Sequence, residues 1–492
     1  MFAEKPGSPW EVVLALIGGA LAVWVGGRGA DDDGLVRCAA RQSSDGVNVH
    51  VKLRADVASD ATLHAAEARC LSGHPLFTFA PAGAHDDRVR WIQIAAASPG
   101  AAEQLAAELA ADPSVEQAFV EPAVALPTPH TRLPLDDRCP ITTPSFESYQ
   151  GYLGPAPHGI DAPAAWRRGL RGGGVWFADV EGGWNAAHED LPGDRIHHVA
   201  GQPIRDPSWR SHGTAVLGEV VGRDNGKGVV GIAPDVERVF TSSIGGLAVA
   251  NAIDAAANRL RAGDVLLIEL QSSGPRGGWI PVEYWDDVYD AIKTATQRGV
   301  VVIEAAGNGN ENLDHRDYRN KFDRRTRDSG AIMVGAGGPP RDGFSDRERL
   351  EFSNYGTRVD VQGWGRKVAT LDYGDLQTCA GADRHYTGEF SGTSSASPIV
   401  AGAAVILEGL ARTRGGVVQP RELRELLRST GTPQAGDVSE PIGPRPNLAA
   451  AIIAANRWGG PGGAGRSPLG SIDGLEIPLA VHDCGFRSMS GS

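Results

Sequence analysis

Residues 300–310 read V-V-V-I-E-A-A-G-N-G-N, and this short stretch already indicates a fold class. Its first half is a continuous apolar run, which is typical of a strand buried on both faces of a sheet. Similar runs occupy residues 174–180, 265–270 and 331–334, and segments of helical pattern separate them. The alternation predicts an α/β domain with a mostly parallel sheet and helices on both faces. We expect this domain to span residues 150–456.

The flanking segments differ from this domain in pattern. Residues 46–130 have extended runs on both sides of one helical pattern, which predicts a small α+β unit. Its helix should begin after Ser98, a good N-cap, with Pro99 in the first position. Residues 131–149 are Pro-rich and predict an exposed linker. Residues 457–492 form a tail rich in Gly, Pro and Ser.

Residues 1–45 form a leader with two alternative interpretations. An apolar run at residues 12–25 is interrupted only by Gly18 and Gly19. It is shorter than the ~20 residues that a membrane span needs, and no later run is apolar enough to span a bilayer. The run is either the apolar part of a secretory signal or a β-hairpin that turns at the two glycines. A secreted or cell-envelope location is therefore an expectation, with a cytoplasmic location as the alternative.

Composition excludes several classes of protein. The chain has 492 residues, of which 41% are apolar, and this is enough for a large core. Its net charge of −13 argues against a nucleic-acid partner, because phosphate binding rests on clustered Lys and Arg. The 5 cysteines lie far apart and form no C-x-x-C pair, so neither a zinc site nor a disulfide scaffold is predicted.

Three segments carry the residues of a nucleophilic mechanism. Residues 390–398, F-S-G-T-S-S-A-S-P, precede a helical pattern, and the free N–H groups of a helix start favour an oxyanion. Ser394 is therefore a candidate nucleophile, with a plain N-cap as the alternative. A serine hydroxyl needs a base, and His212 is the candidate. Asp179 ends a predicted buried strand and is the candidate that orients the histidine.

A fourth segment supplies a candidate oxyanion donor. The stretch quoted first ends in A-A-G-N at residues 305–308, and the Asn308 amide can donate a hydrogen bond to an oxyanion. Each segment alone is equally well explained as a cap or a turn. All four, however, fall at strand ends or helix starts of one predicted sheet, which favours a single active site.

In these motifs the chain resembles the subtilisin-like serine proteases, the subtilase family. Residues 392–398, G-T-S-S-A-S-P, resemble the family's serine motif, with Ser395 where Met is commonest. S-H-G-T at 211–214 resembles its histidine motif and A-A-G-N its oxyanion motif. The resemblance implies a serine endopeptidase with a seven-stranded, mostly parallel sheet and a triad of Asp179, His212 and Ser394. A catalytically silent, peptide-binding relative is the alternative function.

One motif departs from the family pattern. After the triad aspartate the family usually has Thr or Ser and then Gly, whereas Val180, Glu181 and Gly182 follow Asp179 here. Glu181 is then an extra carboxylate, for which three alternatives stay open. It raises the pKa of the histidine, binds a cation or points to solvent.

The resemblance also implies the partners. A protein or peptide substrate should lie as an added strand along a backbone edge. The substrate-binding residues it implies are Leu270, Gln271, Ser272, Ser273, Gly274, Ala306 and Gly307. It implies further that residues 46–130 are a propeptide, which inhibits its own active site as in a zymogen and is removed by cleavage in the Pro-rich linker.

No cofactor and no metal is required by this chemistry. The charged residues 314–328 leave two alternatives, a calcium-binding loop, as the resemblance implies for some members, or a solvated surface loop. The basic residues in this segment would repel a cation and favour the second.

Overall fold

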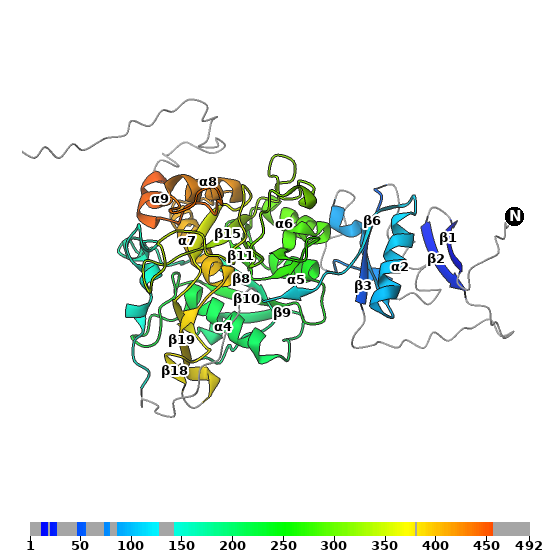
Figure 1. The fold of residues 1–492 in the computed structure, drawn as a ribbon. Coiled ribbons are helices and arrows are strands. Elements are labelled where there is room, and N and C mark those ends of the chain that lie inside the picture. Colours follow the sequence, from blue (N-terminus) through cyan, green and yellow to red (C-terminus); the bar gives the residue numbers. More distant parts are fainter. Residues whose placement is uncertain are drawn as a thin grey trace, which may run out of the picture.

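The computed structural model in Figure 1 describes residues 11–17, 20–26, 47–55, 73–78, 86–126, 142–378 and 381–455. Near the N-terminus, β1 (Glu11–Ile17) and β2 (Ala20–Gly26) pair antiparallel, with Ile17 opposite Ala20. The apolar run of the leader therefore forms a hairpin, which was one of its two alternatives. Most of the Pro-rich linker and the C-terminal tail lie outside the described residues.

An antiparallel sheet and one helix form the N-terminal α+β unit. The sheet has the order β4-β5-β3-β6, and its core is shared with the helix α2. Ser98 accepts a hydrogen bond from the Ala101 N–H, and Pro99 is the first helical residue, as the sequence predicted. The elements are β3 (Val47–Leu53), β4 (Gly73–Pro75), β5 (Trp91–Ala96), α2 (Pro99–Ala110) and β6 (Val115–Val120).

A seven-stranded sheet with the order β16-β15-β14-β11-β8-β10-β9 forms the centre of the larger unit, and all its strand pairs are parallel. This confirms the predicted α/β class. The strands are β8 (Trp176–Glu181), β9 (Ile196–Ala200), β10 (Arg238–Ser243), β11 (Val265–Ile268), β14 (Val301–Ala305), β15 (Ile332–Gly337) and β16 (Val361–Trp364).

Helices cover both faces of this sheet (Figure 1). Val265 and Leu267 of β11 pack into the core shared with α4 and α7, whereas Leu266 and Ile268 pack into the core shared with α5 and α6. Because alternate side chains enter two different cores, the strand is apolar throughout. The helices are α3 (Ala162–Trp166), α4 (Pro207–Val221), α5 (Val249–Ala257), α6 (Asp286–Gln297), α7 (Thr393–Arg412), α8 (Pro420–Thr430) and α9 (Leu448–Ala455).

Two small antiparallel sheets and several short 3₁₀ helices complete the described residues. The sheets are β13-β12-β7 and β17-β19-β18. Their strands are β7 (Val124–Ala125), β12 (Gln271–Ser273), β13 (Trp279–Pro281), β17 (Val368–Leu371), β18 (Gln377–Thr378) and β19 (His385–Phe390). The 3₁₀ helices are η1 (Asp87–Arg90), η2 (Glu147–Tyr149), η3 (Gly151–Leu153), η4 (Gly193–Arg195), η5 (Val282–Tyr284), η6 (Arg316–Tyr318) and η7 (Ala382–Arg384).

By length and composition, helix α7 is the one helix among the described residues that could cross a membrane, although no such run was expected after the leader from the sequence. Its most apolar window is, however, 94% buried inside the protein. It packs against α4 and against β11, β14, β15 and β16. The apolar character of α7 is accounted for by its place in the core.

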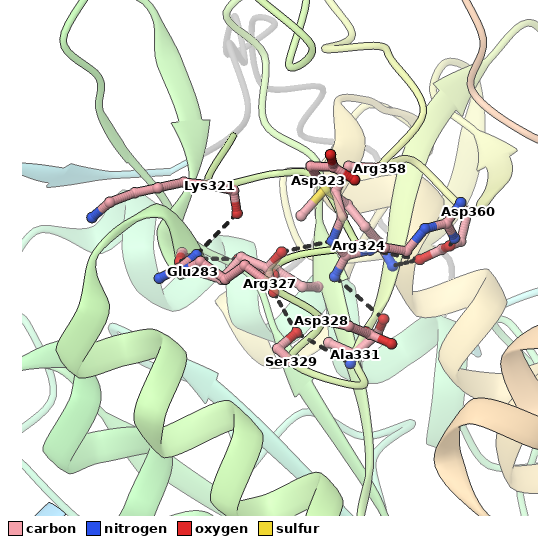
Figure 2. Close-up of polar contacts among 12 residues, drawn as sticks. Glu283, Lys321, Asp323, Arg324, Arg327, Asp328, Ser329, Ala331, Arg358 and Asp360 are labelled. Atoms are coloured by element: carbon pink, nitrogen blue, oxygen red, sulfur yellow. Dashed lines mark hydrogen bonds and ion pairs between the residues drawn. The ribbon is translucent and has the colours of Figure 1, made fainter. Parts of the chain in front are cut away.

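The charged segment 314–328 is tied to the body of the protein by ion pairs (Figure 2). Lys321 and Arg327 both pair with Asp286 at the start of α6, and Arg324 pairs with the buried Asp360. Tyr318 is also fully buried. The expectation of a merely solvated loop is therefore wrong for these side chains, because their charges meet opposite charges from distant parts of the chain.

Candidate active site

The predicted catalytic residues lie at the carboxyl ends of central strands and on the helices beside them. Asp179 and Glu181 lie on β8, and Asn308 follows β14. His212 lies in α4, and Ser394 is the second residue of α7. The two helices pack against each other. The fold thus brings these segments together at the carboxyl ends of the strands, where parallel α/β sheets usually have their active sites.

Glu181 is a hydrogen-bond partner of the His212 side chain. The imidazole Nδ1 is bonded to Glu181 Oε1, and both side chains are fully buried. The sequence prediction assigned this contact to Asp179, and the structure corrects it. Both carboxylates point to the same face of β8 because they are two residues apart, but Glu181, the nearer to the end of the strand, meets α4.

The sequence contained a signal for this correction. The family pattern places a glycine two residues after the acid. Glu181 has Gly183 at that position, whereas Asp179 has Glu181 itself. Glu181 therefore has the correct spacing and an unusual residue type, and Asp179 has the usual residue type and the wrong spacing.

Asp179 has a different partner. Its Oδ2 accepts a hydrogen bond of 2.7 Å from the Trp184 indole N–H, and its Oδ1 has no hydrogen-bond partner among the described residues. Burial and the charge of Glu181 raise the pKa of Asp179 well above its usual value, against the lowering effect of the Trp184 bond. Two neighbouring buried carboxyls do not both ionise easily.

Burial also sets the protonation of the histidine and of Glu181. It lowers the pKa of the His212 imidazole to about 3, so the ring is neutral near neutral pH, as a general base must be. Burial raises the pKa of Glu181, and the hydrogen bond from the Gly182 backbone N–H partly offsets this rise.

Glu269 is a further buried carboxyl group. It accepts a 2.6 Å hydrogen bond from the Ser397 hydroxyl of α7.

The loop after β14 holds Asn308 against the start of α7. The Asn308 side-chain oxygen accepts hydrogen bonds of 3.0 Å from both the backbone N–H and the hydroxyl of Thr393, the residue before Ser394. The Gly307 N–H donates to the same Thr393 hydroxyl, at 3.2 Å. Gly307 has φ +89, which favours glycine, and a side chain there would press on Asn354.

Asn354 supports this loop and was missed in the sequence. Its amide donates to the carbonyl oxygens of Ala306 and Trp279, at 2.6 and 2.7 Å. Its side-chain oxygen accepts from the N–H groups of Gly309 and Glu311. No pattern marks such a residue, because a buried Asn that bonds to distant backbone looks like any loop Asn.

A strand from the N-terminal unit occupies the predicted substrate edge. β12 pairs antiparallel with β7, with Gln271 opposite Ala125 and Ser272 opposite Val124. The Ser273 N–H donates to Ala123, at 3.2 Å. The remaining predicted edge residues flank this strand: Leu270 is in the core, and Gly274 forms the turn to β13.

Basic side chains of the N-terminal unit meet aspartates of α5 and α6, which lie beside that unit in Figure 1. His50 Nδ1 lies 2.8 Å from Asp287 Oδ2, and Lys52 Nζ lies 2.8 Å from Asp290 Oδ2. Arg88 pairs with Asp254. Within the described part of the chain, no group of three His, Cys, Asp or Glu side chains is arranged to hold a metal ion.

Comparisons with known proteins find similar chains over much of the larger unit. Residues 185–443, which include His212, Asn308 and Ser394, match the model of the Subtilase family. The intracellular serine protease of Paenibacillus polymyxa is 28% identical over 285 residues, which cover 55% of this chain and 78% of that protein. Subtilisin BL of Lederbergia lenta is 29% identical over 279 residues, covering 56% and 89%.

A solved structure with a similar fold is that of fervidolysin from Fervidobacterium pennivorans, a keratinolytic enzyme related to subtilisin. The TM-score is 0.55 at 20% sequence identity, and the match covers 83% of this chain and 61% of that one. This likeness concerns the fold.

Proposed function

The chain belongs to the subtilase family, and from that premise we propose that Ser394, His212 and Glu181 are its catalytic triad. It is a serine-type endopeptidase. The observation that carries the triad proposal is the buried hydrogen bond between His212 Nδ1 and Glu181 Oε1. Asp179, bonded to Trp184 instead, is not part of the proposed triad.

In the proposed mechanism, the Ser394 hydroxyl attacks the scissile carbonyl while His212 Nε2 takes its proton. Glu181 accepts the Nδ1–H bond and stabilises the imidazolium that forms. The oxyanion is held by the Asn308 amide and the Ser394 backbone N–H at the start of α7. Thr393 supports this role of Asn308, because it engages the amide oxygen and leaves the NH₂ as the group that donates. His212 then protonates the leaving amine, and water releases the acyl-enzyme.

The proposed substrate is a protein or peptide that adds a strand to β12. The pairing of β7 with β12 supports this choice, because β7 is an extended segment that lies antiparallel along the same strand. The Gln271 side chain contributes a further bond, from Nε2 to the Leu126 carbonyl at 2.9 Å.

We further propose that the N-terminal unit is the enzyme's own inhibitor and is removed by self-cleavage. Two observations support this: β7 blocks the substrate edge, and charged pairs fasten the unit to α5 and α6. The predicted cleavage segment falls largely outside the described residues.

Release of this unit is expected to depend on pH through His50. Burial alone would lower the His50 pKa, but the hydrogen bond and charge of Asp287, with the charge of Glu121, outweigh it and raise the pKa above 6.5. A raised pKa means that the bound unit is stabilised by the protonated ring, fully so below pH 6.5, and that this stabilisation is lost as the pH rises through the raised value.

Incubation of the full chain at about pH 9 should therefore release activity several-fold faster than incubation at about pH 6, with all samples assayed at one common pH. His50→Gln should reduce the ratio of the two release rates, whereas His74→Gln, at an exposed histidine, should leave that ratio unchanged. If the wild type and both variants give the same ratio, His50 does not control the pH dependence of release.

The activity itself is tested with a fluorophosphonate probe, which labels an activated serine. The wild type should be labelled and should lose its N-terminal unit, and Ser394→Ala should be unlabelled and keep its full length. A folded wild type that keeps its full length and takes no label would favour the alternative, a catalytically silent peptide-binding protein.

A further inference from the structure

Two tryptophans pack reciprocally between the end of β8 and α4, each against a glycine that neighbours His212 or Glu181 in the chain. Trp184 follows β8 and rests on Gly213, the residue after His212; a Cβ added to Gly213 would lie 2.8 Å from the indole Cδ1 and Nε1. Trp209 belongs to α4 and rests on Gly182, the residue after Glu181, where an added Cβ would collide with the ring. Each indole therefore touches backbone next to the acid or the base.

Asp179 fixes one of these tryptophans. Its Oδ2 accepts the Trp184 N–H at 2.7 Å, and the carboxyl is fully buried. The next residue, Asn185, donates its backbone N–H to the Thr214 hydroxyl of α4 at 2.9 Å. The chain leaving β8 is thus held against the first half of α4 both by the indole and by a hydrogen bond.

We propose that Asp179 is a positioning residue for the reaction: it holds the Trp184 indole against α4 and so fixes the distance between His212 and Glu181. This inference rests on the proposed function in taking Glu181 as the triad acid. Asp179 acts as a hydrogen-bond acceptor and not as a charge. Its proximity to Glu181 supports this role, since the neutral form of one buried carboxyl lets the other carry the charge.

The choice of variants follows from that role. Asn has a side-chain oxygen that can accept the same indole N–H, so Asp179→Asn keeps the contact, whereas Asp179→Ala removes it. Trp184→Phe removes the donor and keeps an aromatic ring on Gly213. Trp176→Phe is the matched control, because Trp176 lies on β8 with Asp179 and its indole N–H has no hydrogen-bond partner in the described part of the chain.

We expect Asp179→Ala and Trp184→Phe to lower kcat by about 10²-fold with KM unchanged, since a displacement of about 1 Å in a catalytic group has such an effect. Asp179→Asn and Trp176→Phe should both stay within about threefold of wild type. Thermal unfolding of each variant checks that it is folded. The rescue by Asn separates positioning from loss of stability.

Two outcomes would overturn the inference. One is a wild-type kcat in folded Asp179→Ala or in Trp184→Phe, which would mean that the hydrogen bond between Asp179 and Trp184 has no effect on the reaction. The other is a loss in Asp179→Asn as large as in Asp179→Ala, which would mean that the charge is needed. Failure of the proposed function looks different, because Glu181→Gln would then stay active or the wild type would take no fluorophosphonate label.

Discussion

Glu181→Gln is expected to lower kcat by about 10⁴-fold, the scale of loss when a triad carboxylate becomes an amide. The amide NH₂ would donate to His212 Nδ1, where the carboxylate accepts. The imidazole would then carry its proton on Nε2 and could not take the proton of Ser394. Kinetics of the processed enzyme on a chromogenic peptide measure the effect, with KM expected to change little.

The control for this prediction is Glu351→Gln, because Glu351 is 70% exposed and pairs only with Arg366 among the described residues. It should behave as wild type. The wild-type profile adds a second check: burial raises the pKa of Glu181, so kcat should fall as the pH falls through that raised value. If Glu181→Gln retains more than about a tenth of the wild-type kcat, the assignment of the acid is wrong.

Arg358→Met is expected to lower the free energy of unfolding by about 3–5 kcal/mol, the cost of leaving a buried charge without its partner. Arg358 is fully buried between two carboxylates, and it donates to Glu283 and to Asp360 at 2.7 Å each (Figure 2). Without it, Glu283 would lie beside the buried Glu304, with the Ser329 hydroxyl as its side-chain donor among the described residues.

The matched control is Arg325→Met. Arg325 comes from the charged segment 314–328, but its side chain is 88% exposed and pairs with Asp323. An exposed pair contributes about 0–1 kcal/mol. The free energy of unfolding is measured by urea unfolding of both variants. Both are made in the Ser394→Ala background, which prevents self-digestion. If the free energy of unfolding falls equally in the two variants, the buried ion pairs of Arg358 contribute no more to stability than the exposed pair of Arg325.

The sequence predicted the sheet because its strands face two cores. Leu266 and Leu267 enter opposite cores, and so the apolar run is unbroken and easy to recognise. His212 and Ser394 were predicted from short motifs. The choice between Asp179 and Glu181 was harder, since both point to one face of β8 and the start of α4 determines which of them meets the histidine.

The ion pairs of the charged segment 314–328 could not be predicted from the sequence. A run of mixed acidic and basic residues has the same pattern whether its side chains are solvated or form ion pairs. The partners of Lys321, Arg324 and Arg327 are Asp286 and Asp360, from distant elements. Only the tertiary fold determines those pairs.

The short strand β7 also bears on timing. β12 has β13 on one side and β7 on the other, so no other strand can pair with β12 on that second side while β7 is in place. Under the proposed function, a freshly folded molecule is latent even with every catalytic group in place. Once self-cleavage has occurred, turnover of an added substrate still waits for a mechanical event, the departure of that strand, so the lag that follows cleavage reports on docking.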